Sequence, residues 1–242
     1  MKIPTIRGLI DRRILVNFRI APALLTNILP KPFRPQIVNG FGVAGICLIR
    51  LAQVRLKWMP AWMGVSSENA AHRIAVEWDT ASGVRTGVFV PRRDTSSRLN
   101  SMAGGRIFPG VQNRAHFDVD ETEDDYRIGM QSIDKTASVS VECQRSAAMP
   151  DDSIFRTIDD ASRFFKAGSL GYSPQRTNRV YDGMELKTFT WSLEPLSVSQ
   201  VESSFFEDRC RFPVGSVTFD NALLMRGIEH EWHSGSPICC KD

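Results

Sequence analysis

One block of the sequence carries three side-chain types that together suit acid–base chemistry. Glu68-Asn69-Ala70-Ala71-His72-Arg73 places a carboxylate, an imidazole and a guanidinium close together in the chain. An imidazole can take or give a proton near neutral pH, and a neighbouring carboxylate can orient it. We therefore predict His72 as a catalytic acid or base oriented by Glu68, with Asn69 and Arg73 as ligand contacts. The alternative is a structural histidine at the edge of a sheet.

A second block is rich in arginine. Pro91-Arg92-Arg93-Asp94 ends an apolar run, and two further arginines follow it closely. Guanidinium groups bind carboxylates and phosphates through paired hydrogen bonds. Neighbouring residues of a strand point to opposite faces, so only one arginine of the pair can point inward. The predicted anion contacts from this block are Arg92, Arg98 and Arg106. The alternative is a salt-bridge network with Asp94 and Glu77 that fixes a helix to the sheet.

A sheet must bring these two blocks together. His72 to Trp78 alternates polar and apolar residues, which is typical of a strand with one solvent-exposed face. Val84 to Val90 is a second apolar run, and the Ser82-Gly83 turn between the runs predicts a hairpin. The tryptophan-rich segment Lys57 to Gly64 is expected either to plug one end of the core or to cover a pocket.

The remaining pattern is dominated by strands. Asn39-Gly40 between two apolar runs predicts a hairpin, and the acidic run Asp118 to Asp125 predicts a solvated hairpin tip. Further strands are expected over 113–144 and 180–232, with helices after Pro22 and over 154–168. We therefore expect an α+β fold of mostly antiparallel strands, an open β-cone or barrel with two or three packed helices. One domain is expected over 1–242, with a core of about 12–233 and a flexible tail from 234.

Composition excludes several classes of function. The net charge is +3 and the basic residues are dispersed, so no nucleic-acid partner is expected. No apolar run approaches the roughly 20 residues of a membrane-spanning helix, and no secretory leader is recognisable. The five cysteines have irregular spacing, which favours reduced thiols and a cytoplasmic location. A homo-oligomer is compatible with this composition.

Phosphate-loop, dinucleotide and nucleophile-elbow motifs are missing from the sequence. His230 and His233 resemble a metal pair, with Cys239 and Cys240 close behind. Residues three apart in a strand point to opposite faces, however, so we expect no metal site and no cofactor.

The order of the blocks quoted above resembles the domain-of-unknown-function 2071 family of bacterial proteins. The resemblance covers roughly Ile14 to Trp232 and includes the segment Gly104-Gly105-Arg106-Ile107-Phe108-Pro109-Gly110. That family is similar to the acetoacetate-decarboxylase-like superfamily, which implies a β-cone with a central pocket. It also implies a lysine that forms a Schiff base, with its pKa lowered by an adjacent lysine.

The matching segment, Phe108 to Asn113, contains no lysine. The nearest lysines in sequence, Lys57 and Lys135, have no lysine beside them. Decarboxylation through an imine is therefore not expected. Our leading hypothesis is a cytosolic protein that binds a small polar or anionic organic molecule in the cone and that, if it is an enzyme, acts by acid–base chemistry without a Schiff base. A non-catalytic binding or sensing module and a divergent decarboxylase that uses Lys57 or Lys135 are the alternatives.

Overall fold

A computed structural model describes residues 4–103, 110–175 and 180–239 of the chain. Strands dominate this part of the protein, as expected for the predicted α+β class. The helices are α1 (Pro22–Ile28), the 3₁₀-helix η1 (Ala61–Met63), α2 (Arg98–Ala103) and α3 (Ile158–Ala167). The strands are β1 (Ile6–Ile20), β2 (Arg34–Pro35), β3 (Ile37–Val38), β4 (Phe41–Leu56), β5 (Val65–Thr80), β6 (Gly83–Thr95), β7 (Asn113–Glu121), β8 (Asp125–Ser132), β9 (Ser138–Arg145), β10 (Leu170–Pro174), β11 (Val180–Thr188), β12 (Glu194–Ser203) and β13 (Val217–Cys239).

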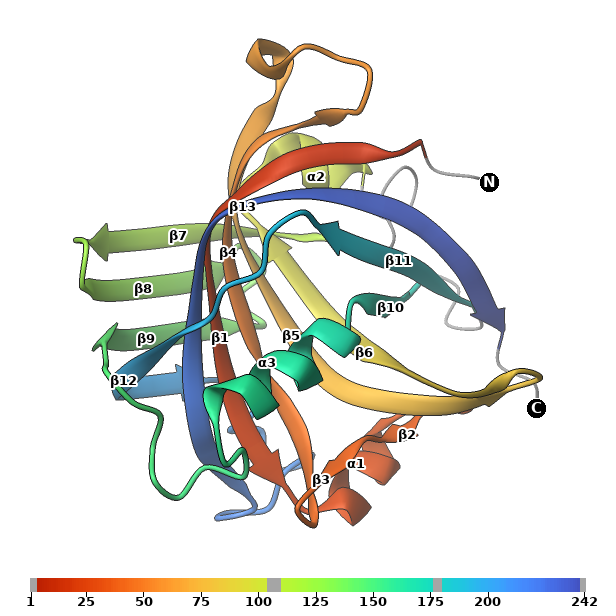
Figure 1. The fold of residues 1–242 in the computed structure, drawn as a ribbon, viewed down its shortest axis with the longest axis vertical. Helices are drawn as coiled ribbons and strands as arrows, with labels where there is room; N and C mark the ends of the chain where they lie inside the picture. The colour runs from red at the N-terminus through yellow and green to blue at the C-terminus, as the bar shows by residue number, and fades with distance from the viewer. Residues whose placement is uncertain (1–3, 104–109, 176–179, 240–242) are drawn as a thin grey trace.

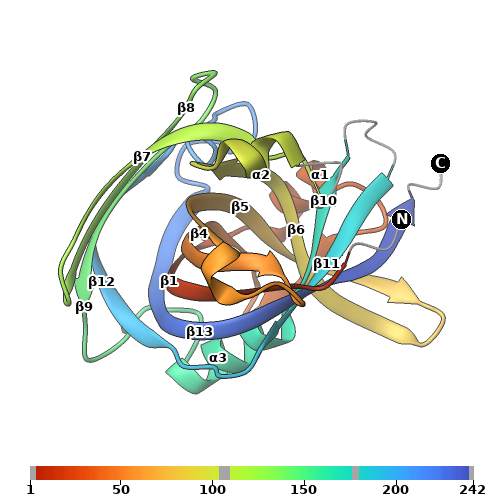
Figure 2. The ribbon, with the colours of Figure 1, turned by 90° about the horizontal axis from the view of Figure 1, so that it is seen from above.

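All these strands belong to one sheet that closes on itself twice. The order β13-β1-β4-β5-β6-β10-β11 returns to β13 and forms what we call the small ring. The order β13-β1-β4-β5-β6-β7-β8-β9-β12 also returns to β13 and forms the large ring. Figure 1 shows β7, β8 and β9 on one side of the shared strands and β10 and β11 on the other. In Figure 2, β7, β8 and β9 form the arched side of the large ring that lies away from the shared strands.

Glycines allow the small ring to close. A Cβ atom on Gly87 of β6 would lie 2.4 Å from the carbonyl oxygen of Leu170, so only glycine lets β10 run beside β6 there. On the other side of the ring, Gly183 of β11 is paired with Gly235 of β13. A Cβ on Gly235 would come within 3.0 Å of the Gly183 carbonyl carbon. The backbones at this closure are therefore too close for side chains.

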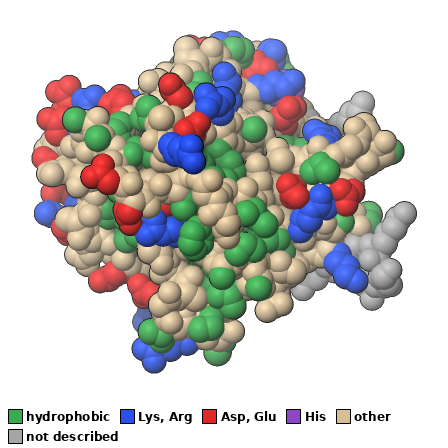
Figure 3. Space-filling model, turned by 60° about the horizontal axis from the view of Figure 1, so that its bottom comes forward, with side chains coloured by type: hydrophobic (Ala, Val, Ile, Leu, Met, Phe, Trp, Pro, Cys, Tyr) green, Lys and Arg blue, Asp and Glu red, His purple; other side chains and the backbone are tan. Residues whose placement is uncertain are grey.

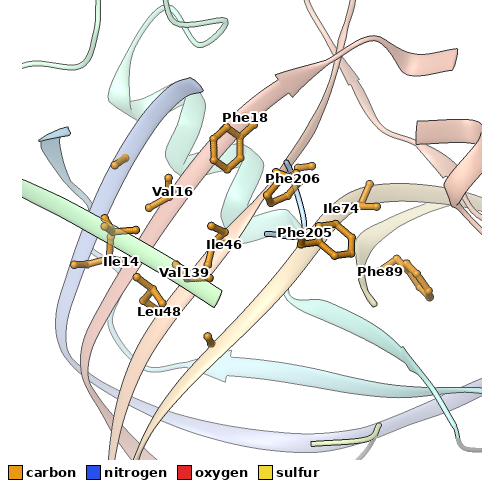
Figure 4. Packing of buried hydrophobic residues seen from close by; sticks show 14 of the residues in the cluster. Ile14, Val16, Phe18, Ile46, Leu48, Ile74, Phe89, Val139, Phe205 and Phe206 are labelled. Atoms are coloured by element: carbon orange, nitrogen blue, oxygen red, sulfur yellow. The ribbon is translucent and has the colours of Figure 1, made fainter. Parts of the chain in front are cut away.

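The shared strands are buried on both faces because each face lines one ring. Inside the large ring, β1 and β4 contribute apolar residues such as Ile14, Val16 and Ile46, and these pack with Phe205 and Phe206 from the loop after β12 (Figure 4). On the opposite face, Leu15 and other apolar residues pack against α3. The expectation that His72 to Trp78 has one solvent-exposed face was wrong, because β5 has a ring interior on each side.

The three predicted hairpins are present, and Ser82 lies in the turn that joins β5 to β6. Asn39 and Gly40 both have positive φ, 47° and 86°, as a two-residue turn between β3 and β4 requires. The acidic run joins β7 to β8, and Glu123 and Asp124 at its tip are largely exposed. In the face shown in Figure 3, acidic side chains gather on the side where β7, β8 and β9 lie, intermixed with basic ones.

Several segments differ from expectation. The tryptophans of the 57–64 segment neither plug the core nor cover a pocket, because Trp58 and Trp62 are 79% and 83% exposed at the tip of the β4–β5 hairpin. Residues 234–239 are not a loose tail but the end of β13, paired with β11. Strand β10 was not predicted, since its five residues include a glycine and a proline. No helix in the described segments is long and apolar enough to cross a membrane.

A buried ion-pair network ties the shared strands to β7. The Arg12 guanidinium on β1 is fully buried and lies 2.6 Å from Glu68 and 2.5 Å from Glu121. Arg50 of β4 binds the same two carboxylates, at 2.5 and 2.6 Å. Burial acts to raise the pKa of Glu121, but the hydrogen bonds and charges of Arg12 and Arg50 outweigh it and the pKa is lowered. Two cations and two anions thus neutralise one another inside the large ring.

His72 also lies inside the large ring, fully buried. Its Nε2 is 3.0 Å from Ser203 Oγ, and its ring lies 4.8 Å from that of Phe205. Burial lowers the pKa of His72 to about 3, with smaller contributions from Arg92 and Arg211. Burial likewise lowers the pKa of His230 to about 4. Both imidazoles are therefore neutral in the folded protein at physiological pH.

Replacement of Arg12 by Met should destabilise the protein by about 3 kcal/mol, because it removes the fully buried cation shared by two largely buried carboxylates. Arg127 provides the control, since it pairs with Glu142 at 3.0 Å but is 66% exposed. Arg127→Met should cost less than about 1 kcal/mol. Urea denaturation of both variants measures the difference. Equal losses would contradict a dominant role for the buried network.

Stability should fall as the pH drops from 6 to 5. The unfolded state protonates both histidines near pH 6.5, whereas the folded pKa values of His72 and His230 are about 3 and 4. Unfolding therefore takes up protons in this window, and each histidine should contribute about 1.2 kcal/mol per pH unit. His72→Gln should remove about half of the combined slope, whatever its effect on stability at pH 7. Urea denaturation across this range tests it, and an unchanged slope would show that His72 is protonated normally in the fold.

Candidate anion-binding cavity

The small ring surrounds a cavity of about 410 Å³ that is partly open to solvent. Residues from all seven of its strands line the cavity, together with residues of α3 and the segments that flank it. In Figure 1, α3 lies across the shared strands, and its Phe165 packs against the cavity-facing side of the sheet. A volume of this size suits a small organic molecule.

The sheet register explains which side chains enter the cavity. Cys47 of β4 is paired with Ala71 of β5, and Ala71 is paired with Arg93 of β6. Directly paired residues point to the same face, so these three side chains form one row across the cavity wall. Arg73 lies two residues further along β5 and shares that face. The small Ala71 side chain in the middle of the row leaves room for a ligand.

Three arginines line this cavity, and none of them forms an ion pair with a carboxylate within the described segments. Arg13 Nε donates to Cys47 Sγ at 3.1 Å, and Arg93 Nε donates to Ser173 Oγ at 3.0 Å. Arg73 donates to the side-chain oxygen of Asn17, and its guanidinium stacks on the Phe165 ring at 4.9 Å. These partners are neutral. In the large ring, by contrast, carboxylates balance the charges of Arg12 and Arg50.

The buried guanidiniums remain charged at neutral pH. Burial lowers the pKa of Arg73 and of Arg93 to about 10, and the nearby Cys47 opposes this lowering in both cases. Glu185 is the one carboxylate among the residues that line the cavity, and it lies 3.8 Å from Lys187. The wall of β1, β4, β5 and β6 is thus cationic, which suits an anionic ligand.

A narrower space of about 70 Å³ adjoins the cavity and shares Cys47, Ala71 and Arg93 with it. Asn69, one of the predicted ligand contacts, lines this space. Its side-chain nitrogen donates to Ser67 Oγ at 2.9 Å, which holds the amide in place. Arg73 and Asn69 are therefore the predicted contacts that the fold brings to this side of the sheet.

The other predicted arginines lie elsewhere. Arg92 points into the large ring, where it makes two hydrogen bonds of 2.9 Å to the buried Asp94. This contact is part of the salt-bridge alternative, whereas Glu77 pairs with Arg34 instead. Arg98 is exposed at the first residue of α2. Arg106 lies outside the described residues.

His72 and Glu68 do not line the cavity, because they lie on the face of β5 that forms the large ring. They are four residues apart on one strand, a separation of roughly 13 Å, so Glu68 cannot orient the imidazole. Glu68 instead binds Arg12 and Arg50. The catalytic assignment of this pair stays a sequence-based prediction that the geometry does not support.

Arg13 and Cys47 are cavity residues that the sequence analysis did not single out. The sequence did carry a signal, because Arg12-Arg13 and Arg92-Arg93 are both arginine pairs next to apolar runs. In each pair one side chain enters the large ring and the other enters the cavity. Adjacent charges in a doubly buried strand therefore mark two separate polar sites.

The lysines considered for an imine do not line this cavity. Lys57 lies 3.0 Å from Glu231, and Lys135 has a positive φ of 57° in the turn between β8 and β9. Lys166 and Lys187 do line it. Of the segment Phe108 to Asn113, only residues from 110 onward are described, and Gln112 lines the narrower space. Within the described residues, no group of three potential ligands is placed to hold a metal ion.

Solved structures with the same fold include enzymes. An acetoacetate decarboxylase from Legionella pneumophila has a TM-score of 0.62 at 12% identity, covering 98% of this chain and 88% of its own. An acetoacetate decarboxylase-like enzyme from Sphingomonas wittichii RW1 has a TM-score of 0.59 at 12% identity, covering 98% and 92%. The enduracididine biosynthesis enzyme MppR, complexed with pyruvate, has a TM-score of 0.58 at 10% identity, covering 98% and 90%.

These likenesses establish the acetoacetate decarboxylase-like fold that the sequence predicted. Comparison with curated proteins found none that matches this sequence. A family model described as an uncharacterized conserved protein, DUF2071, matches residues 10–218. The chain therefore belongs to the domain-of-unknown-function 2071 family.

Proposed function

We propose that the protein binds a small organic acid in the small-ring cavity, with Arg13, Arg73 and Arg93 as the anion contacts. The observation that carries this proposal is the charge imbalance of the cavity wall. A buried charge without a counterion is costly, and the large ring of the same sheet shows arginines paired with carboxylates. A bound carboxylate would supply the missing partner of the three cavity arginines.

The fold neighbours support an oxo acid as the ligand class. MppR is complexed with pyruvate, a 2-oxo acid, and the name acetoacetate decarboxylase refers to a 3-oxo acid. Both molecules combine one carboxylate with a short carbon skeleton. The cavity offers guanidiniums for the carboxylate and apolar side chains such as Val88 and Val90 for the skeleton. All of these contacts come from a single chain, so the proposed site does not depend on a homo-oligomer.

Under this proposal the protein binds a ligand, and no catalytic step is assigned to it. Acid–base catalysis by His72 is not included, because that imidazole faces the other ring. An imine route through a second pair of residues is the alternative, since Lys166 and Lys187 both line the cavity. Lys187, however, lies 3.8 Å from the carboxylate of Glu185.

Pyruvate should raise the melting temperature of the wild-type protein, by about 3–5 °C at ten times its dissociation constant. Arg93→Met should weaken binding about 10–100-fold, because it removes a charge-assisted contact to the carboxylate. Arg13→Met should act in the same direction. Differential scanning fluorimetry measures both, with circular dichroism to confirm that the variants are folded.

Arg98→Met is the matched control, because Arg98 is exposed on α2 and away from the cavity. Its pyruvate response should equal that of the wild type. Pyruvamide, which lacks the carboxylate, should produce no shift in any of these proteins. A shift with pyruvamide, or an Arg93→Met variant that binds pyruvate normally, would refute the arginine site.

Borohydride treatment in the presence of pyruvate or acetoacetate should leave no covalent adduct on lysine. An imine would be reduced to a stable amine and would add mass to one peptide. Intact-mass and peptide mass spectrometry test this expectation. An adduct mapped to Lys166 or Lys187 would instead identify a divergent decarboxylase-like enzyme.

A further inference from the structure

Cys47 lies at the centre of the cationic wall. Its side chain is 3% exposed and lines both the larger cavity and the narrower space beside it. The other described cysteines lie away from both spaces. Cys143 is in the core of the large ring, where burial raises its pKa to about 12, and Cys210 and Cys239 are exposed. Cys47 is therefore the thiol that a cavity ligand would meet.

Cys47 packs with the apolar cluster that includes Leu15 and Phe165, but its sulfur also has a cationic neighbour. Arg13 Nε donates to its Sγ at 3.1 Å. Arg73 and Arg93 line the same cavity, and Cys47 acts to raise the pKa of each, so three guanidiniums lie on the cavity wall that carries this thiol. Reactive cysteines are found in electropositive, ligand-accessible environments of this kind, whereas structural cysteines are buried among apolar groups.

A second observation points independently to a ligand at this thiol. Arg73 is 4% exposed, and its Nε has no hydrogen-bond partner among the described residues, although it lines the same cavity. A buried N–H donor without an acceptor is costly. The described residues leave this donor unsatisfied, and the Arg73 side chain lines the same cavity as Cys47.

We propose that Cys47 adds reversibly to the carbonyl carbon of an oxo acid whose carboxylate is held by the cavity arginines. In this step the sulfur–carbon bond forms, the electron pair of the carbonyl π bond moves to the oxygen, and the thiol proton is transferred to that oxygen. The product is a thiohemiketal, and neither an oxidant nor a reductant is required. This inference rests on the proposed binding of an oxo acid and extends it from a binding site to a covalent one.

The first test uses two alkylating reagents of similar size, anionic iodoacetate and neutral iodoacetamide. The full-length protein is treated with each, and peptide mass spectrometry follows labelling at every cysteine. Cys47 should prefer iodoacetate over iodoacetamide about tenfold or more relative to 2-mercaptoethanol in solution, because the arginines concentrate the anion. Arg93→Met should reduce this preference, and pyruvate should protect the thiol. Slow labelling of Cys47 without charge preference would overturn the inference.

The second test detects the addition itself. Pyruvate labelled with ¹³C at its carbonyl carbon is added to the protein and observed by NMR. A thiohemiketal moves this carbon from the ketone region to the region of saturated carbon. The new signal should appear with the wild type and be missing with Cys47→Ser, whereas Cys210→Ser should retain it.

The outcomes separate the two proposals. If pyruvate raises the melting temperature and requires Arg93, but no saturated-carbon signal appears, the cavity binds the acid and Cys47 is not its nucleophile. If pyruvate neither binds nor protects Cys47, the proposed function fails and the covalent step fails with it. A saturated-carbon signal that persists in Cys47→Ser would assign the addition to another group and would also overturn the inference.

Discussion

The burial of both faces along the central parts of β1, β4, β5 and β6 is the constraint on which the structure depends. These strands are shared by two closed rings, so neighbouring residues along each strand enter different interiors. In most antiparallel sheets a polar residue between two apolar ones can simply face water. In the central parts of these strands a polar residue cannot face water, so each polar side chain needs a partner inside one ring or the other. The chemistry of each ring therefore depends on which partners it provides for its buried polar side chains.

The two rings provide different partners for their buried arginines. In the large ring, Arg12 and Arg50 share Glu68 and Glu121, and Arg92 binds Asp94, so charge is balanced within the protein. In the small ring, Arg13, Arg73 and Arg93 have a thiol, an amide and a hydroxyl as partners. The filled interior of the large ring has aromatic side chains around His72, whereas the small ring retains a cavity. One ring is thus a stabilising core, and the other holds the cavity that we propose as a binding site.

The sequence was sufficient for the fold and only partly sufficient for the site. Alternation and turn chemistry located most strands, and the glycine and proline blocks identified the family. The single strand pattern of His72 to Trp78 could not show that both of its faces are interior, since that depends on ring closure at distant residues such as Gly87 and Gly235. His72 and Arg73 were therefore assigned to one site although they face opposite rings. Arg13 and Cys47 were missed because their relevance arises only from the register of β1, β4, β5 and β6.

The same constraint explains how a shared fold can carry different chemistry. Backbone hydrogen bonds hold the rings together, and they do not depend on which side chain occupies a position such as 47 or 93. The fold neighbours retain this architecture at 10–12% identity. A cationic wall without carboxylates lowers the stability of the free protein, and it offers no packing advantage over apolar side chains of similar size. A negatively charged ligand would balance this wall. The arginines beside the cavity would then lower the stability of the free protein in return for ligand binding.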